Sequence, residues 1–318
     1  METIITSFSN PKIKDVIKLH ESNYRRDSRR FLIDGLREIE RAALSGIQFL
    51  EFFILESKID IARKLAPNNN VTINIVSELL IQKIRFGNRN DGIVAVALSG
   101  HGKNLRQLSD FQISATENQY NIADFSDINS SCFQIPETEH ANIASRNGCS
   151  TTKPNTNNGF GIPLFVVLEK IEKPGNIGAV FRSADGAGVS GIILADQLTD
   201  LYNPNTIRAS LGTLFSIPVV ETAGLRAREW LLENNIRIAT AKCGGEFSYT
   251  KYDFRQPTAI VLGSEAEGLT EIWSGEKITP ITIPMSGVAD SLNISTAAAI
   301  LLYEAKRQRS HNNQNERQ

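Results

Sequence analysis

Apolar runs of strand length alternate with helical patterns throughout the C-terminal half of this chain. The runs PLFVVL (163–168), SGIILAD (190–196) and TAIVLG (258–263) are long enough for buried strands and too short to span a membrane. Strands that alternate with helices favour a mostly parallel sheet with both faces covered. The pattern therefore predicts an α/β fold. Further strands are expected at 217–221, 236–240 and 281–284.

The end of the chain has the pattern of a long amphipathic helix, which we expect at 291–308. Apolar side chains recur there at intervals of three and four residues and so share one face: Ile294, Ala297, Ala298, Leu301, Leu302 and Ala305. The last ten residues, RSHNNQNERQ, are polar, and we expect them to fray, with a tail at 311–318.

Residues 1–103 are expected to form a smaller α/β domain of their own. Helical spacing occurs at 10–20, in the segment that ends at Gly46, and near 58–65. Strand-like runs lie at 31–35, 49–55, 71–76 and 91–98.

The segment between these two parts has a different composition. Asn, Ser and Thr account for 19 of the 49 residues at 112–160. A segment with so few apolar side chains cannot bury enough surface to offset the entropy of ordering it. We expect a flexible linker at 104–160, and the alternative is a small element packed on one domain. The larger α/β domain then covers 161–310.

Charge permits a nucleic-acid partner without requiring one. The whole chain has a net charge of −1, whereas residues 1–103 have 16 basic residues against 12 acidic ones. The basic side chains are densest at Arg25, Arg26, Arg29 and Arg30, which are the candidate RNA-binding residues.

Metal and membrane functions have no support in the sequence. Cys132, Cys149 and Cys243 show no ligand spacing, so we expect no metal site and idle thiols. No apolar run approaches about 20 residues, and the N-terminus lacks the pattern of a signal peptide. A cytoplasmic protein is the expectation.

Three segments join a strand-like run to Gly, Asn or Ser and then to a helical pattern, and the first is PGNIGAVFRSADGAG (174–188). Gly178 allows a close backbone approach there. Asn176 is either a helix N-cap or a functional amide. Arg182 lies among apolar neighbours, so it needs either an acidic partner within the protein or an anionic ligand. The GxxG spacing disfavours a dinucleotide site.

The second and third segments are IVLGSEAEGL (260–269) and the stretch from Ile283 to the final helix. Glu265 stands in a polar turn between glycines, which fits either an ordinary helix start or a ligand site. Ser291 is a natural N-cap for the final helix. Asn293 gains little in a first helical turn unless its amide bonds to another group.

A serine hydrolase is the competing enzyme class, and the residue inventory excludes it. The four histidines are His20, His101, His140 and His311, all outside 161–310, and the chain lacks GxSxG. No base is therefore available to activate Ser291 or Ser264.

Taken together, the three segments closely resemble the SpoU (TrmH) family of RNA ribose 2'-O-methyltransferases, within the SPOUT class. The resemblance covers about 161–308. Residues 1–100 more weakly resemble the substrate-binding domain of the family, an L30e-like α/β sandwich. The resemblance also implies a deep trefoil knot in the C-terminal domain, which periodicity alone does not predict.

The resemblance implies S-adenosylmethionine as methyl donor, no metal, and particular site residues. Catalytic positions are matched by Asn176, Arg182, Glu265, Ser291 and Asn293. Donor-binding positions are matched by Thr240, Leu262, Gly263, Ile283, Met285 and Leu292. Ser210, in the stretch 203–219, is also expected to line the site.

The resemblance further implies an RNA partner, with large-subunit ribosomal RNA favoured over tRNA, and a homodimer formed through the C-terminal domain. In the family, the arginine that Arg182 matches is regarded as the base that takes the proton of the hydroxyl group. Because the pKa of arginine exceeds about 12, we favour phosphate binding or stabilisation of a developing alkoxide. The alternative to an enzyme is a non-catalytic RNA-binding relative.

Overall fold

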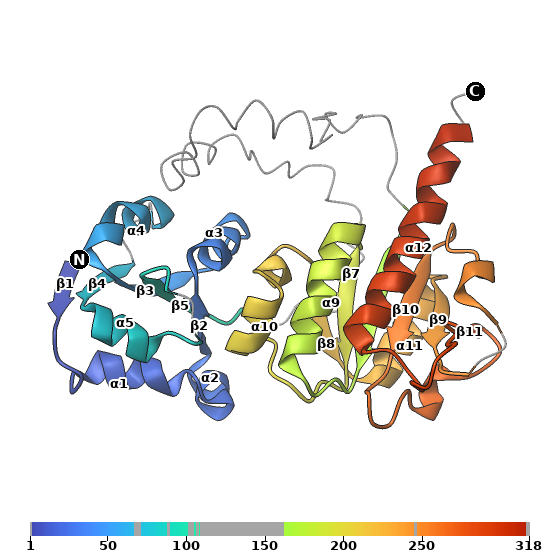
Figure 1. The fold of residues 1–318 in the computed structure, drawn as a ribbon, viewed down its shortest axis with the longest axis horizontal. Helices are drawn as coiled ribbons and strands as arrows, with labels where there is room; N and C mark the ends of the chain where they lie inside the picture. The colour runs from blue at the N-terminus through green and yellow to red at the C-terminus, as the bar shows by residue number, and fades with distance from the viewer. Residues whose placement is uncertain are drawn as a thin grey trace. The chain divides into compact units, whose positions relative to one another are not determined.

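A computed structural model describes residues 2–66, 71–87, 90–100, 105, 108, 162–244 and 247–315 of the 318-residue chain. Two β-sheets organise them, one of five strands in the N-terminal part and one of six strands in the C-terminal part (Figure 1). Nearly all of the linker predicted at 104–160 lies outside the described residues, so its flexibility stays a prediction.

The N-terminal sheet is mixed, in the order β1-β4-β3-β5-β2. Strand β4 is parallel to β1 and β3, whereas β5 runs antiparallel to β2 and β3. The edge strand β1 was not predicted, because its four residues are too few for a pattern and Ile4 is exposed. The strands are β1 (Glu2–Ile5), β2 (Arg30–Asp34), β3 (Phe49–Ile54), β4 (Thr72–Val76) and β5 (Ile93–Leu98).

Helices accompany this sheet, and the sequence predicted the more periodic of them. Asn10 caps α1 and Pro11 begins it, an arrangement that favours a helix start. Helices α2 and α5 were not predicted from the sequence. The helical elements are α1 (Pro11–Lys18), α2 (Ser22–Ser28), α3 (Leu36–Leu44), η1 (Glu56–Lys58), α4 (Ile59–Leu65) and α5 (Glu78–Ile84).

The C-terminal sheet has the order β11-β9-β10-β6-β7-β8, and each neighbouring pair is parallel. The predicted parallel α/β fold is therefore confirmed. The strands are β6 (Leu164–Glu169), β7 (Gly191–Ala195), β8 (Val219–Thr222), β9 (Arg237–Ala241), β10 (Thr258–Leu262) and β11 (Ile278–Ile281). The last strand was expected at 281–284, but it begins at Ile278. It contains Pro280, which is tolerated because β11 lies at the edge of the sheet.

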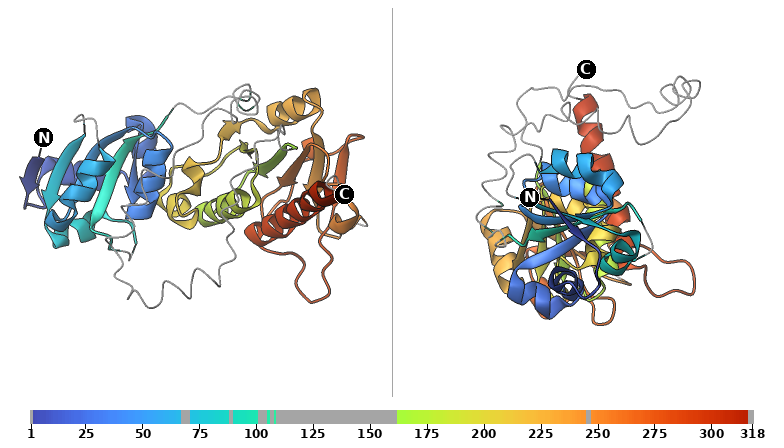
Figure 2. Two further views of the ribbon diagram at one scale, coloured as in Figure 1. Left: turned by 90° about the horizontal axis from the view of Figure 1, so that it is seen from above. Right: turned by 90° about the vertical axis from the view of Figure 1, so that its left-hand side faces the viewer.

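Helices cover both faces of this sheet (Figure 2). Helices α9 and α12 pack together on the face formed by Val166 and Leu168, whereas α11 covers the face of Phe165 and Val167. The helical elements are α9 (Pro174–Ala187), α10 (Pro204–Ala209), η3 (Thr213–Phe215), α11 (Gly224–Glu233), η4 (Tyr249–Lys251), η5 (Glu271–Trp273) and α12 (Ile294–Asn315).

The final helix confirms one expectation and corrects another. Its predicted apolar face is buried at Ile294, Ala298, Leu301, Leu302 and Ala305. The helix continues to Asn315, beyond the end at residue 308 that the sequence predicted, and fraying of the last residues stays a prediction. No helix among the described residues is long and apolar enough to cross a membrane.

Leu108 belongs to the C-terminal core, although the sequence placed it in the linker. Its side chain is 1% exposed and lies in the buried cluster that contains Phe165 and Trp230. A β-carbon added to Gly191 would lie 2.9 Å from the Cδ2 atom of Leu108, which shows how closely the two residues pack.

Candidate active site

The polar residues of the three segments meet at the carboxyl ends of β6 and β10 and at the start of α12. The Asn176 Nδ2 atom donates to the Glu265 Oε1 atom at 2.5 Å. The Asn293 Nδ2 atom lies 3.2 Å from both Glu265 Oε1 and Asn176 Oδ1. The structure thus brings three of the five predicted catalytic residues into one hydrogen-bonded cluster, from segments up to 117 residues apart.

The start of α9 explains why Asn176 is available to this cluster. Pro174 is the first residue of the helix and Lys173 occupies the N-cap position, so Asn176 does not cap the helix. Helix α10 lies close to α9, since a β-carbon on Gly178 would stand 2.5 Å from the Thr206 carbonyl oxygen. Ser210 was expected to line the site. Instead it is fully buried, and its hydroxyl donates to the Ile207 carbonyl oxygen.

At the start of α12, the roles of Asn293 and Ser291 differ from those that the sequence suggested. Asn293, not Ser291, is the N-cap: its Oδ1 atom accepts from the Ser295 backbone nitrogen at 2.9 Å and the Ser295 Oγ atom at 2.6 Å. These bonds orient the amide so that its nitrogen faces Glu265. Ser291 precedes the helix and is free to contact a ligand.

Lys173 joins the cluster, and sequence reasoning missed it. Its ammonium group forms an ion pair with the Glu265 Oε2 atom. The hydrogen bond within this ion pair is the main reason why the pKa of Glu265 is lowered and the pKa of Lys173 is raised. The signal available in the sequence was its position, directly before the Pro-Gly-Asn turn. Glu265 is therefore ionised at neutral pH and holds three donors.

Replacement of Lys173 by Met is expected to move the acidic limb of the pH–activity profile to higher pH. The folded-state pKa of Glu265 is depressed, so the ionised form persists until the pH falls through that lowered value. Loss of the lysine removes the largest lowering cause, and protonation then begins at higher pH. The rate of the catalysed reaction, measured from pH 4 to pH 8 for the variant and the wild-type protein, tests this expectation. The exposed Lys277→Met variant is the control, and an unchanged acidic limb for Lys173→Met contradicts the prediction.

Arg182 lies two turns after the start of α9, and its side chain is exposed. Within the described part of the chain, no hydrogen bond or ion pair joins it to the cluster or to an acidic side chain. The alternative of an internal ion pair is therefore not observed, and its guanidinium faces outward.

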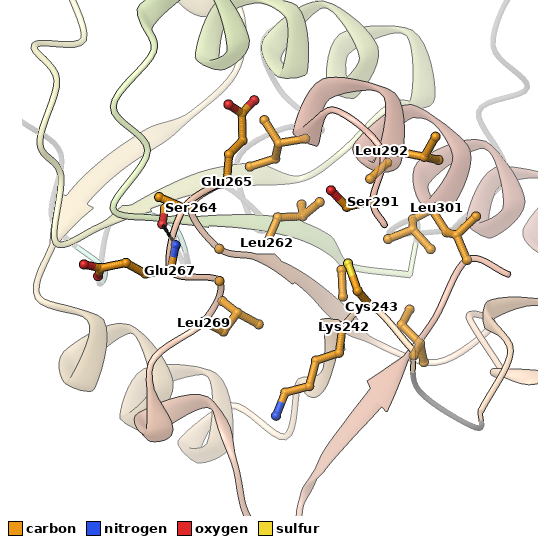
Figure 3. Close-up of a pocket in the computed structure, with 18 of the residues that line it drawn as sticks. Lys242, Cys243, Leu262, Ser264, Glu265, Glu267, Leu269, Ser291, Leu292 and Leu301 are labelled. Atoms are coloured by element: carbon orange, nitrogen blue, oxygen red, sulfur yellow. Dashed lines mark hydrogen bonds between the residues drawn. The ribbon is translucent and has the colours of Figure 1, made fainter. Parts of the chain in front are cut away.

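A cavity of about 510 Å³ opens beside the cluster (Figure 3). The loop after β10 forms one wall, and the start of α12 and the segment after β11 form another. Five of the six predicted donor-binding residues line the cavity, together with Glu265 and Ser291: Leu262, Gly263, Ile283, Met285 and Leu292. Thr240 does not line it. This residue is fully buried one position before Ala241, and its hydroxyl has no partner among the described residues.

The loop after β10 is closed so tightly that only glycine fits at its first position. A β-carbon on Gly263 would lie 2.2 Å from the Gly268 carbonyl oxygen and 2.6 Å from the Leu269 nitrogen. The wall is therefore made of backbone as well as apolar side chains. The size of the cavity and this mixture of groups fit a nucleoside-sized ligand such as S-adenosylmethionine. No three potential metal-ligating side chains gather anywhere in the described residues.

The basic cluster in and just after α2 is only partly exposed. Arg25 was predicted to bind RNA, but it is 3% exposed, pairs with Asp200 at 2.6 Å and bonds the Leu19 carbonyl oxygen at 2.7 Å. That prediction is therefore corrected, because its guanidinium is held inside the protein. Arg30 is half-buried and pairs with Asp15. Arg26 and Arg29 are exposed.

A parallel α/β sheet with a polar cluster and a nucleoside-sized cavity at its carboxyl edge is typical of α/β proteins that bind a ligand at the carboxyl ends of their strands. The comparison with known families is more specific. Residues 163–303 match the model of the SpoU rRNA Methylase family, and residues 10–95 match the MRM3-like substrate binding domain. The chain belongs to the SpoU methylase family.

Curated relatives match less than half of this chain. A 23S rRNA (uridine(2479)-2'-O)-methyltransferase from Streptomyces viridochromogenes is 37% identical over 46% of this chain and 53% of its own length. The 23S rRNA (guanosine-2'-O-)-methyltransferase RlmB of Salmonella typhi is 35% identical over 46% of this chain and 61% of that protein. The chain thus spans little more than half the length of these relatives.

Solved structures match over nearly the whole chain. An RNA 2'-O ribose methyltransferase is 31% identical, with a TM-score of 0.69 over 97% of this chain and 100% of that one. The SpoU methyltransferase AviRb from Streptomyces viridochromogenes, in complex with the cofactor AdoMet, is 25% identical, with a TM-score of 0.71 over 95% and 100%.

Proposed function

We propose that this chain transfers a methyl group from S-adenosylmethionine to a ribose 2'-hydroxyl of RNA, with large-subunit ribosomal RNA as the substrate. The cluster of Asn176, Glu265 and Asn293 beside the cavity carries the proposal. The relatives named for 23S rRNA 2'-O-methylation and the AdoMet complex of AviRb support it.

The cavity is suited to hold the donor in place. S-adenosylmethionine supplies a methyl group bonded to a positively charged sulfur. The ribose 2'-oxygen forms a bond to the methyl carbon as the carbon–sulfur bond breaks in line, S-adenosylhomocysteine leaves, and the hydroxyl proton passes to solvent. Leu262, Ile283 and Leu292 form apolar walls that exclude water, and the backbone from Gly263 onward offers hydrogen-bonding groups. A fixed donor and a fixed hydroxyl need little further ordering, so positioning supplies a large part of the barrier reduction.

The polar cluster is suited to hold the ribose. Ionised Glu265 accepts a hydrogen bond from a hydroxyl, and the amides of Asn176 and Asn293 are both donors and acceptors. Ser291, on the cavity wall, offers a further hydroxyl contact. Arg182 is assigned to a phosphate of the RNA or to the developing alkoxide, because its guanidinium is already protonated at neutral pH and has no free site to take the proton.

The assembly and fold details belong to the same proposal. We expect a homodimer through helices of the C-terminal domain, in which α12 faces the partner and the active site is completed across the interface. We also expect the family's trefoil knot in the C-terminal domain and an L30e-like fold in the N-terminal part. A ribosomal RNA substrate is consistent with work in the cytoplasm.

Transfer of tritiated methyl groups from S-adenosylmethionine to unmodified RNA tests the proposal. We expect label in large-subunit ribosomal RNA. Label in tRNA alone would retain the chemistry and overturn the proposed substrate. Absence of label from both RNAs, with no donor binding by calorimetry, would favour a non-catalytic RNA-binding protein.

Arg26→Ala and Arg29→Ala are each expected to weaken RNA binding and to reduce the slope of log affinity against log salt by about one, since each exposed arginine neutralises a phosphate. The measurement is a salt titration of binding to ribosomal RNA fragments. Lys64→Ala, on the exposed side of α4, is the charge-matched control. Slopes that match the wild-type protein would remove α2 from the RNA interface.

A further inference from the structure

The carboxylate of Glu169 is fully buried at the carboxyl end of β6, and the proposed reaction gives it no task. Its Oε2 atom accepts from the Thr270 backbone nitrogen at 2.9 Å, and its Oε1 atom accepts from the Thr270 Oγ1 atom at 2.6 Å. Both oxygens of the carboxylate are therefore engaged by Thr270. They hold Thr270 against β6, although the two residues are 101 positions apart.

Thr270 directly follows the loop that forms one wall of the donor cavity. Every residue at 262–269 lines that cavity (Figure 3). The loop begins where Leu262 pairs with Leu168 of β6, and it ends where Thr270 binds Glu169. Two consecutive residues of one strand therefore fix both ends of the loop.

The interior of the loop folds back on itself, so the fixed ends determine its shape. Ser264 and Gly268 exchange two backbone hydrogen bonds of 3.2 and 3.0 Å, and the Glu267 nitrogen donates to the Ser264 Oγ atom at 3.1 Å. Gly268 has a φ of 71°, which closes the turn. A wall held in this way meets its ligand without further ordering, which favours affinity.

The surroundings of Glu169 leave it no direct contact with RNA or donor. Gly224 at the start of α11 packs over the carboxylate: a β-carbon there would lie 3.5 Å from Glu169 Oε1 and 2.7 Å from Asp196 Oδ2. Glu169 does not line the cavity. Any effect on the reaction must therefore pass through Thr270 and the loop.

We propose that Glu169 is a positioning residue for methyl-donor binding, which anchors Thr270 and so fixes the shape of the 263–269 wall. The proposal rests on the proposed function, because it takes this cavity as the donor site. Loss of the anchor weakens donor binding and leaves RNA binding intact. A residue that only stabilises the fold would instead lower the folded fraction and leave both KM values unchanged.

Calorimetry with S-adenosylhomocysteine on the full-length protein tests this. Glu169→Gln places an amide donor against the donors of Thr270, and we expect the Kd to rise about tenfold. Thr270→Val removes only the hydroxyl, and it replaces Glu169→Gln as the test variant if Glu169→Gln folds poorly. We expect its Kd to rise about fivefold. Thr270→Ser retains both donors, and its Kd should stay within about twofold of the wild-type value.

Thr213→Val is the matched control, because it removes a buried threonine hydroxyl that bonds the Ser210 carbonyl oxygen at 2.8 Å, far from the loop in sequence. It should lower Tm without change in Kd. Methyl-transfer kinetics should show a raised KM for S-adenosylmethionine and an unchanged KM for RNA in the Glu169 and Thr270→Val variants. Equal Kd values for wild type, Glu169→Gln and Thr270→Val would overturn this proposal alone. Absence of binding by the wild-type protein would overturn both proposals.

Discussion

Asn293→Ser is expected to lower kcat about a hundredfold while leaving the melting temperature close to that of the wild-type protein. Serine keeps an oxygen that caps α12, so the helix start is preserved. The substitution removes the amide nitrogen that Glu265 and Asn176 share at 3.2 Å. Loss of one well-placed donor from an active site costs on the order of a hundredfold in rate. Single-turnover methyl transfer and thermal melts measure the two effects separately.

Asn203→Ser is the matched control for this experiment. Asn203 caps α10 through the same contact, in which its Oδ1 atom accepts from the Asn205 nitrogen at 2.9 Å. Among the described residues, its amide nitrogen makes no hydrogen bond to Asn176, Glu265 or Asn293, so the rate should stay within about threefold of wild type. If Asn293→Ser and Asn203→Ser have equal rates, the amide of Asn293 has no part in the reaction.

Gly263→Ala is expected to weaken S-adenosylmethionine binding about a hundredfold, which is the size of effect that overpacking by up to 3 kcal/mol produces. The added β-carbon would meet the Gly268 carbonyl oxygen at 2.2 Å and the Leu269 nitrogen at 2.6 Å. Both obstacles are backbone, so the loop must open, and the hydrogen bonds between Ser264 and Gly268 are lost. Calorimetry with the donor measures the change.

Gly287→Ala is the control for the glycine experiment. It lies in the segment between β11 and α12, and a β-carbon there would have no neighbour within 4 Å. Donor affinity should stay within about twofold of wild type. A Gly263→Ala protein that binds the donor as tightly as Gly287→Ala would show that the loop is not the donor wall.

The sequence predicted what is encoded locally. Buried strands such as β6 and β10 appear as short apolar runs, and the final helix shows its periodic face, so the parallel α/β fold followed without a structure. The family resemblance carried by the three polar segments singled out Asn176, Glu265 and Asn293. Their meeting has a physical reason, because a parallel sheet brings the residues after its strands to one edge.

What the sequence left undetermined depends on contacts between distant residues. The choice between Ser291 and Asn293 as N-cap depends on where the backbone becomes helical. The sequence does not fix that position, because several polar residues nearby could each cap the helix. Arg25 stood in a basic cluster, yet a partner 175 residues away holds it inside the protein. Glu169 was not singled out in the sequence, because its partner Thr270 lies 101 residues further along the chain.

The position of the methyl group on the RNA is the most direct test of the central claim. Ribosomal RNA methylated by the wild-type protein and by Asn293→Ser is digested to nucleosides and analysed by mass spectrometry. The account predicts a 2'-O-methylated nucleoside from large-subunit RNA with the wild-type protein, and little or none with the variant over the same time. A methyl group found on a base, or equal amounts of product from both proteins, would contradict it.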